Sequence, residues 1–403
     1  MTIDVLGLLV LFGTTVVIGY VGSVIFDKTR IPDIIWLILF GIIVGPLFSF
    51  IEREIFINIS PLLAALALLI ILFDAGLNLD FFKLLRNTPR SLLLSVVNIL
   101  IAIPIVAFVS VYFLGLSLLS GLLLGAMLGG TSSPVVISIV NKLRTREKVK
   151  TILMLESIIT DPLVIIVSIA LLNLIVPINQ NYSPLQGLLG TFSIGAMLGL
   201  ITGLVWLFVL DKIKDRPFDH MLTLAIVFLL YALVESSGGS GPISAFAFGV
   251  VLGNGKKFCE MLKFRKIFTV SRIMRTFQDE VTFFIKSFFF VYLGLIVVLN
   301  REYILYGVII SFILILTRIV SVKIASVRFN IEAIERKIMS AMVPRGLAAA
   351  VLAQLPMSYG LPNAEIFSNV VLVVILTTVL YSTFMTWFFS RKSEMETLKP
   401  KQK

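Results

Sequence analysis

A long apolar segment runs from Thr151 to Val176 and reads TILMLESIITDPLVIIVSIALLNLIV. Its length suits a helix that crosses a bilayer, which takes about 20 residues. The segment nevertheless contains two carboxylates, Glu156 and Asp161. An ionised carboxylate at bilayer depth costs at least about 2.5 kcal/mol on insertion scales, so such a group normally faces protein or water. We therefore expect both acids to have a function.

The two acids are expected to have different roles. At about 100° per residue, Asp161 lies about 140° from Glu156 around the helix, whereas Ser157 lies within about 40° of Asp161. Pro162 cannot donate a hydrogen bond to the carbonyl of Ile158, which leaves that oxygen available. A carboxylate, a hydroxyl and a carbonyl make an oxygen site for a small alkali cation. Because low dielectric favours the neutral acid, Asp161 is expected to hold either a cation or a proton; a purely structural aspartate is the alternative.

The composition indicates a membrane protein. Hydrophobic residues make up 58% of the chain and charged residues 14%, whereas about a quarter of residues are charged in soluble domains. The single cysteine, Cys259, and the single histidine, His220, exclude an internal disulfide and a histidine-rich metal site. The net charge of +11 lies in short loops, so we interpret it as a topology signal and not as nucleic-acid binding. No enzyme class is expected, because the aqueous loops offer neither a nucleophile with its base nor a metal triad.

Thirteen membrane spans are expected, which makes the chain an all-α polytopic membrane protein. Outside the spans, Lys and Arg lie almost entirely in the connections after odd-numbered spans and in the C-terminal tail; the other connections contain only Arg53 and Arg301. By the positive-inside rule, the N-terminus lies outside the cell membrane and the C-terminus in the cytoplasm. The expected spans are 5–26, 34–50, 61–79, 91–114, 118–141, 151–176, 187–210, 219–236, 241–254, 276–299, 303–327, 338–358 and 366–389.

The spans are expected to form two inverted six-helix repeats, because an odd seventh span reverses the orientation of the second set. The membrane domain, residues 1–390, is expected to consist of repeat one at 5–176, a linker helix at 187–210 and the inverted repeat two at 219–389. The remaining residues, 391–403, form a short basic tail, too small for a soluble domain. We expect the function to reside in the membrane domain.

The fifth helix of each repeat is expected to be discontinuous. Span 5 contains Gly129–Pro134, read as GGTSSP, and span 12 contains Val343–Gly346, read as VPRG. Matched interruptions in two halves of a transporter point to a binding site at the membrane midplane. Ordinary packing and kink residues are the alternative for either one alone.

Other charges inside the spans also need roles. Arg345 is the expected ion-pair partner of Glu156, because a lone buried arginine is costly; the alternative is that either side chain reaches a membrane interface. Asp74 is either a second cation ligand, a residue along the approach to the site, or a residue at the membrane boundary. Lys286 and Arg318 are expected to provide structural charge compensation.

Four motifs together resemble those of the monovalent cation:proton antiporters, most closely the NhaP-like sodium/proton exchangers. They are LFDAGL in span 3, GGTSSP in span 5, ESIITDP in span 6 and PRG in span 12. The resemblance implies a homodimer in which broken helices 5 and 12 of each protomer cross near the ion site. It implies that Asp161 is the shared cation and proton carrier, with Ser157 and Thr131 as further ligands. It also matches Asp74 to an acidic ligand, and Glu156 and Arg345 to a structural ion pair.

Two departures from the family pattern bear on the transported ion. Thr160 belongs to the candidate site but stands where such exchangers usually have Asn and electrogenic relatives a second Asp, so one carboxylate favours electroneutral one-for-one exchange. Residues 131–133 read TSS, closer to the branch that includes potassium-efflux antiporters, so Na+, Li+ and K+ all stay open. No cofactor is expected. Two rivals are a sodium-coupled symporter of an organic anion, using Arg345 if Glu156 does not neutralise it, and a channel.

Overall fold

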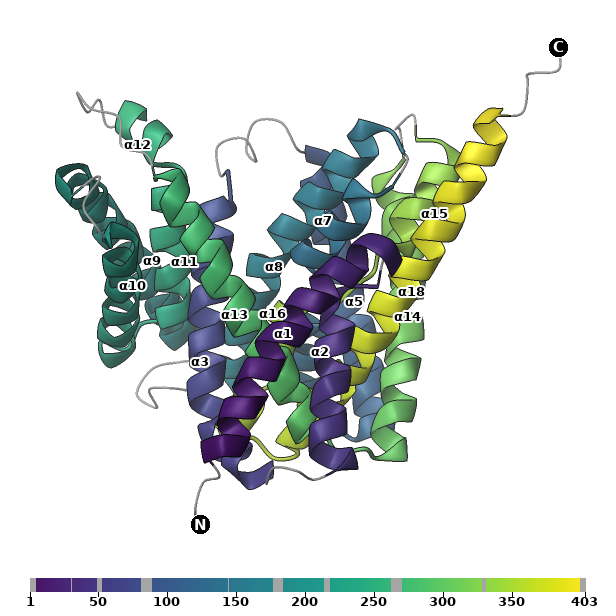
Figure 1. Cartoon of the computed structure of the whole chain (residues 1–403), viewed down its shortest axis with the longest axis horizontal. Helices are drawn as coiled ribbons and strands as arrows, with labels where there is room; N and C mark the ends of the chain where they lie inside the picture. Colours follow the sequence, from purple (N-terminus) through teal and green to yellow (C-terminus); the bar gives the residue numbers. More distant parts are fainter. Residues whose placement is uncertain are drawn as a thin grey trace. The chain divides into compact units, whose positions relative to one another are not determined.

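The computed structural model describes residues 5–29, 31–48, 53–80, 89–143, 145–176, 184–213, 218–261, 270–327 and 331–398. Over these ranges the chain is helical, with connecting turns and no strand (Figure 1). The helices are α1 (Val5–Thr29), α2 (Asp33–Ile42), η1 (Ile43–Leu47), α3 (Arg53–Asn78), α5 (Pro89–Leu114), α6 (Leu118–Met127), α7 (Ser133–Asn141), α8 (Glu147–Ile175), α9 (Pro184–Ile213), α10 (Asp219–Ser236), α11 (Gly241–Gly253), α12 (Gly255–Met261), α13 (Arg272–Ile296), α14 (Arg301–Ala325), α15 (Ala333–Ala341), α16 (Leu347–Leu352), α17 (Leu355–Ser358) and α18 (Ala364–Leu398).

Eight of the described helices are long and apolar enough to cross a membrane: α1, α3, α5, α8, α9, α10, α14 and α18. Shorter apolar helices cover Asp33–Leu47, Leu118–Met127, Gly241–Gly253 and Leu347–Ser358. The expected span at 276–299 overlaps α13. The prediction of an all-helical membrane protein is confirmed, and the number of thirteen crossings stays a prediction.

Two breaks interrupt helices where the sequence predicts them. α6 ends at Met127 and α7 begins at Ser133, so Gly129–Pro134 spans the first break. α15 ends at Ala341 and α16 begins at Leu347, so Val343–Gly346 lies in the second break. In both places Gly and Pro weaken a continuous helix.

The chain forms two compact units. The first unit comprises Met1–Pro61, Pro89–Ser168 and Ser287–Lys403, and the second comprises Leu62–Thr88 and Ile169–Lys286. In the first unit α5 packs against α6 and α14, and α14 also packs against α15 and α18. Both breaks and α8 up to Ser168 therefore belong to the first unit.

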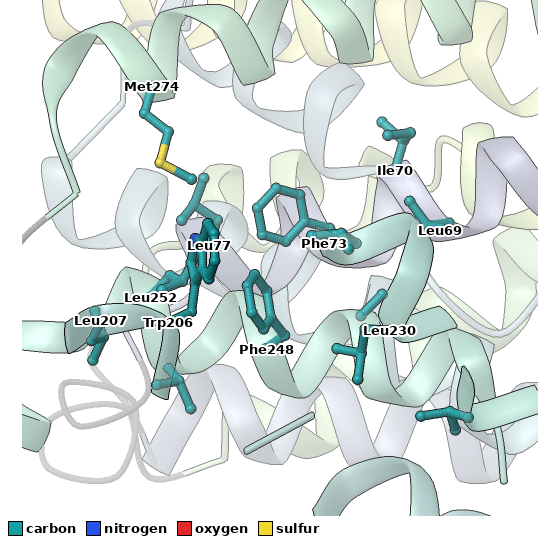
Figure 2. Close-up of a cluster of buried hydrophobic side chains, with 14 of the residues drawn as sticks. Leu69, Ile70, Phe73, Leu77, Trp206, Leu207, Leu230, Phe248, Leu252 and Met274 are labelled. Carbon is teal, nitrogen blue, oxygen red and sulfur yellow. The ribbon is translucent and has the colours of Figure 1, made fainter. Parts of the chain in front are cut away.

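The second unit is built on close helix packing at glycines. α9 and α11 pack along each other, and a Cβ on Gly199 would lie only 2.4 Å from the carbonyl oxygen of Ser244. α3 approaches α11 as closely, because a Cβ on Gly249 would lie 2.4 Å from the carbonyl oxygen of Phe73. Small residues permit such backbone contact between membrane helices. Large side chains fill the space beside these contacts, including Trp206 and Phe248 (Figure 2).

Candidate functional site

The two breaks contact each other inside the first unit. The backbone N–H of Ser132 donates to the carbonyl oxygen of Pro344 at 2.9 Å. Gly346 packs directly against the same serine, because a Cβ at this position would lie 2.1 Å from the Ser132 hydroxyl oxygen. The close approach of the two non-helical segments therefore requires glycine at position 346.

Polar side chains satisfy the backbone groups that the breaks leave without helical partners. Asn98 of α5 donates its amide to a carbonyl of the first break at 2.8 Å. In the second break, the N–H of Val343 donates to Ser382 at 3.0 Å and that of Arg345 to Thr378 at 3.1 Å. Unpaired backbone groups are costly at membrane depth, so these side chains permit the breaks. Sequence reasoning missed them, although polar residues within apolar spans were a signal.

Asp161 projects from α8 toward the start of α7. Its Oδ2 accepts two hydrogen bonds from Ser133, one from the backbone N–H at 3.1 Å and one from the hydroxyl at 2.5 Å. Ser133 is the first residue of α7, where the helix has unpaired N–H groups and the positive end of its dipole. Asp161 is half-buried. Among the described residues, no Lys, Arg or His nitrogen lies within 4.0 Å of its carboxylate oxygens, so it has no ion-pair partner there. The carboxylate is therefore oriented by neutral donors without being neutralised.

The predicted ligands around Asp161 differ in their contacts. Thr131, in the first break, donates its backbone N–H to the Thr160 hydroxyl at 3.1 Å and its own hydroxyl to Glu156 at 3.3 Å. These three side chains are completely buried. Ser157 is also buried, and its hydroxyl donates to the carbonyl of Met154 at 2.9 Å. The sequence does not predict Ser133 as a contact of Asp161, yet Ser133 donates both hydrogen bonds that Asp161 accepts from the described residues.

The expected ion pair between Glu156 and Arg345 is wrong. Both carboxylate oxygens of Glu156 accept from Arg318 of α14, at 2.8 and 2.9 Å. Arg318 also donates its Nε–H to the carbonyl of Met339 at 3.1 Å. Arg318 and Glu156 are both 0% exposed, and the planar guanidinium suits such a two-point contact. Arg318 thus provides charge compensation, but its partner lies on another helix.

Arg345 is buried in the second break with a different set of partners. One of its terminal guanidinium nitrogens donates to the carbonyl of Val343 at 3.2 Å. Its Nε has no hydrogen-bond partner in the part of the chain that the structure describes. The guanidinium interacts electrostatically with Arg318 and Glu156. The break sets the backbone of Arg345 outside helical geometry, which is why helical angles could not predict the direction of its side chain.

Asp74 and Lys286 belong to the second unit. Asp74 is half-buried on the last turns of α3, and its Oδ1 accepts from the amide of Asn78 at 3.0 Å. Lys286 of α13 lies with its ammonium 5.8 Å from the centroid of the Phe283 ring. The site described in the first unit therefore consists of the two breaks and α8.

The geometry separates the two acids of α8 chemically. Glu156 is neutralised by a buried guanidinium, whereas Asp161 is held by hydrogen bonds and stays half-buried. A carboxylate of the second kind can bind a monovalent cation or a proton, since each neutralises its charge. Hydroxyls and backbone oxygens in the adjoining break are hard ligands of the type that alkali cations prefer.

Known proteins are similar to this chain in sequence or in fold. The solved structure of the sodium proton antiporter MjNhaP1 from Methanocaldococcus jannaschii at pH 8 has a TM-score of 0.78 at 22% identity, covering 95% of this chain and 100% of that one. The K(+)/H(+) antiporter NhaP of Alkalimonas amylolytica is 24% identical over 382 residues, which are 93% of this chain and 64% of that protein. The low-affinity Na(+)/H(+) antiporter NhaS1 of Synechocystis is 30% identical over 260 residues, which are 63% of this chain and 47% of that protein.

The proteins from Alkalimonas and Synechocystis are named as antiporters, which are transporters and not enzymes, and this chain spans between about half and two thirds of their length. A family model described as "Sodium/hydrogen exchanger, transmembrane" matches residues 13–391. The match includes α8 and both breaks. The chain therefore belongs to the sodium/hydrogen exchanger family.

Proposed function

We propose that the chain is a secondary active antiporter that exchanges Na+ or Li+ for H+ across the cell membrane, with K+ as the alternative cation. One observation carries the proposal: Asp161 is a half-buried carboxylate in a membrane helix, oriented by Ser133 and without an ion-pair partner among the described residues. The other acid of the helix, Glu156, is neutralised. A single unneutralised carboxylate is what competition between a cation and a proton requires.

Exchange follows from the charge of Asp161. The carboxylate binds the cation on one side of the membrane, releases it on the other against a proton, and returns as the neutral acid. An empty, ionised Asp161 would have to cross as a bare charge, which carries a desolvation penalty of several kcal/mol. Alternating access with only the two occupied forms crossing therefore couples the two fluxes. Since one carboxylate carries one charge, the exchange is one-for-one and electroneutral.

Thr131, Thr160 and Ser157 are proposed as further oxygen ligands of the cation. In the proposed site, Thr131 and Thr160 supply oxygens from the break and from α8, which the hydrogen bond between them supports. Ser157 donates its hydroxyl proton to the carbonyl of Met154, which leaves the lone pairs of its oxygen for the ion. The buried pair of Glu156 with Arg318 holds α8 against α14.

The wider architecture is also proposed. The loop charges support thirteen spans in two inverted repeats, with an external N-terminus and a cytoplasmic C-terminus. The crossing of the broken helices at the site is proposed on the resemblance to the NhaP-like exchangers. A homodimer in the lipid bilayer is proposed on the resemblance to the NhaP-like exchangers. Ion flux would then occur within each protomer.

Proteoliposomes with an imposed pH gradient test the proposal. Na+, Li+ and K+ are added in turn to the native protein and to Asp161→Asn, with the membrane potential clamped. Asp211→Asn on α9 removes the same charge in the second unit and serves as the control. The proposal expects one or more cations to dissipate the gradient in the native protein and the control, but not in Asp161→Asn. Absence of cation-driven proton movement in folded native protein would refute it.

The sodium-coupled symporter gains support from one contact. Because both oxygens of Glu156 bind Arg318, Arg345 forms no ion pair with Glu156 among the described residues and could attract an organic anion. Its burial at 1% exposure weighs against this role. Uptake of labelled acetate, glutamate or citrate under a Na+ gradient, abolished by Arg345→Gln in folded protein, would favour the symporter. Single-channel currents would instead identify a channel.

A further inference from the structure

An arginine at the aqueous end of α8 contacts the start of α15 within the first unit. The guanidinium of Arg146 donates to both carboxylate oxygens of Glu335, and another of its nitrogens lies 3.8 Å from a carboxylate oxygen of Glu332. The Glu335 side chain is only 5% exposed, whereas that of Arg146 is 48% exposed. Surface ion pairs contribute little on average, but a two-point contact to a buried carboxylate is stronger than most.

Both ends of this ion pair also take part in the first turn of a helix. The carbonyl oxygen of Arg146 accepts from the N–H of Val149 at 2.9 Å and from that of Lys150 at 3.3 Å, at the start of α8. Glu335, in the first turn of α15, accepts from the N–H of Glu332, the residue before that helix, at 2.9 Å. Such contacts satisfy backbone groups that a helix end leaves unpaired. The ion pair therefore joins the beginnings of two helices.

α8 and α15 are connected a second time, inside the membrane domain. Arg318 of α14 binds the Glu156 carboxylate of α8 and donates its Nε–H to the carbonyl of Met339 on α15. Met339 lies one helical turn after Glu335, and Glu156 lies further along α8 than Arg146. A single contact would let α15 pivot against α8. Two contacts at different levels fix both the direction and the position of α15.

The position of α15 bears on Asp161, because α15 leads directly into the second break. The carbonyl of Pro344 in this break accepts from the N–H of Ser132 at 2.9 Å. The next residue, Ser133, donates both hydrogen bonds that Asp161 accepts from the described residues. The contacts thus form a closed series, from α8 through α15 and the two breaks and back to α8 at Asp161. Arg146 closes this series at its aqueous end.

We propose that Arg146 is a positioning residue, which acts through Glu335 to hold α15 against α8. In this position α15 keeps the two breaks in contact, and Ser133 stays aligned with the Asp161 carboxylate for cation binding. The inference rests on the proposed function, in which Asp161 binds the transported cation. From the sequence alone, Arg146 is one of the basic loop residues that set the topology; the structure adds a specific partner. Arg146 itself does not contact the cation.

A purely structural ion pair is the alternative, and it predicts a different result. Loss of a structural contact would lower the fraction of folded protein and leave the cation affinity of the folded fraction unchanged. Loss of a positioning contact raises the KM for the cation, while the maximal rate stays near the native value because Asp161 still exchanges the same ions. Since a surface ion pair changes an equilibrium by up to about fivefold, we expect the KM to rise about two- to fivefold.

Cation-driven proton transport in proteoliposomes tests the proposal, with KM and maximal rate measured on protein that is folded by size-exclusion chromatography. Arg146→Gln should raise the KM. Lys150→Gln is the matched control, because it removes the same charge from the first turn of α8, where Lys150 pairs with the exposed Glu147 of the same helix; its KM should stay native. Arg146→Lys keeps the charge but not the two-point contact, so its KM should lie between the two. This variant serves for the comparison if Arg146→Gln does not fold.

The double variant Arg146→Gln with Glu335→Gln decides whether the two residues act together. If they do, its KM equals that of Glu335→Gln alone, because residues in contact are not additive. An unchanged KM in folded Arg146→Gln and Arg146→Lys, or a rise no larger than that in Lys150→Gln, would overturn the proposal. A double variant in which the two single effects multiply would also overturn it. Failure of the proposed function would appear differently, as absent transport in the native protein or as undiminished transport in Asp161→Asn.

Discussion

Replacing Arg318 by methionine should be among the most destabilising single changes in this chain. The substitution keeps an unbranched side chain of similar length but removes the charge that faces Glu156. It eliminates the hydrogen bonds to both Glu156 oxygens, at 2.8 and 2.9 Å, and the one to the Met339 carbonyl at 3.1 Å. Because Glu156 is 0% exposed, water cannot replace the lost donors.

The expected magnitude follows from that burial. Removing one partner of a buried ion pair typically costs about 3–5 kcal/mol, since an uncompensated charge is left behind. Arg345→Met is the matched comparison, because among the described residues the Arg345 side chain donates a single hydrogen bond, at 3.2 Å, and its Nε has no partner. Its replacement should change the free energy of unfolding by about 1 kcal/mol. The double variant Glu156→Gln with Arg318→Met removes both charges and should recover much of the lost stability.

The detergent-solubilised protein is heated, and size-exclusion chromatography then measures the fraction that stays folded. This fraction gives the differences in stability between the variants. The native protein, the two single arginine variants and the double variant are compared at one pH and salt concentration. Equal losses in Arg318→Met and Arg345→Met, or a larger loss in Arg345→Met, would refute the assignment of Glu156 to Arg318. A double variant less stable than Arg318→Met would refute the argument from an uncompensated charge.

Three further predictions concern the breaks and the aqueous end of α15. Gly346→Ala should lower stability or abolish transport, because the alanine Cβ would lie 2.1 Å from the hydroxyl oxygen of Ser132 and 2.5 Å from the Cβ of Ser132. Adding Ser132→Gly should partly rescue the variant, and thermal stability and transport rates measure both effects. Ser133→Ala removes the hydroxyl donor to the site carboxylate but keeps the backbone donor, so the KM for the cation should change about two- to tenfold with the fold intact by chromatography. Burial raises the pKa of Glu335, but the hydrogen bonds and charge of Arg146 outweigh it and hold the pKa below the ordinary 4.5. Its stabilising contribution is therefore present at neutral pH and lost as pH falls below about 4.5; melting from pH 3 to 7 should show this loss in native protein and not in Glu335→Gln.

The sequence was most informative where composition and local chemistry suffice. Both helix breaks lie where glycine and proline interrupt apolar spans, at Gly129–Pro134 and Val343–Gly346. The angular separation of Glu156 and Asp161 along one helix also predicts two environments for them. The structure gives one of them a guanidinium and the other a serine. These features depend on residues close together in the chain.

The side chains that contact Glu156 and Asp161 could not be predicted in the same way, because these contacts depend on how helices that are distant in the sequence pack together. Glu156 pairs with Arg318, a residue 162 positions away. Sequence reasoning favoured Arg345 because it lies in the equivalent helix of the second repeat, but helical geometry does not set the direction of a side chain in a break. Ser133 stands in a motif that was recognised, yet its role depends on α7 beginning at that residue.

The most direct test of the account is whether binding of a cation releases a proton from Asp161. Purified protein in weakly buffered detergent solution is titrated with Na+, Li+ or K+, while pH and cation binding are measured together. The account predicts release of about one proton per bound cation when the carboxylate is protonated, since the two compete for one charge. Asp161→Asn should release none. Cation binding to native protein without proton release, or undiminished release from Asp161→Asn, would contradict the shared carrier.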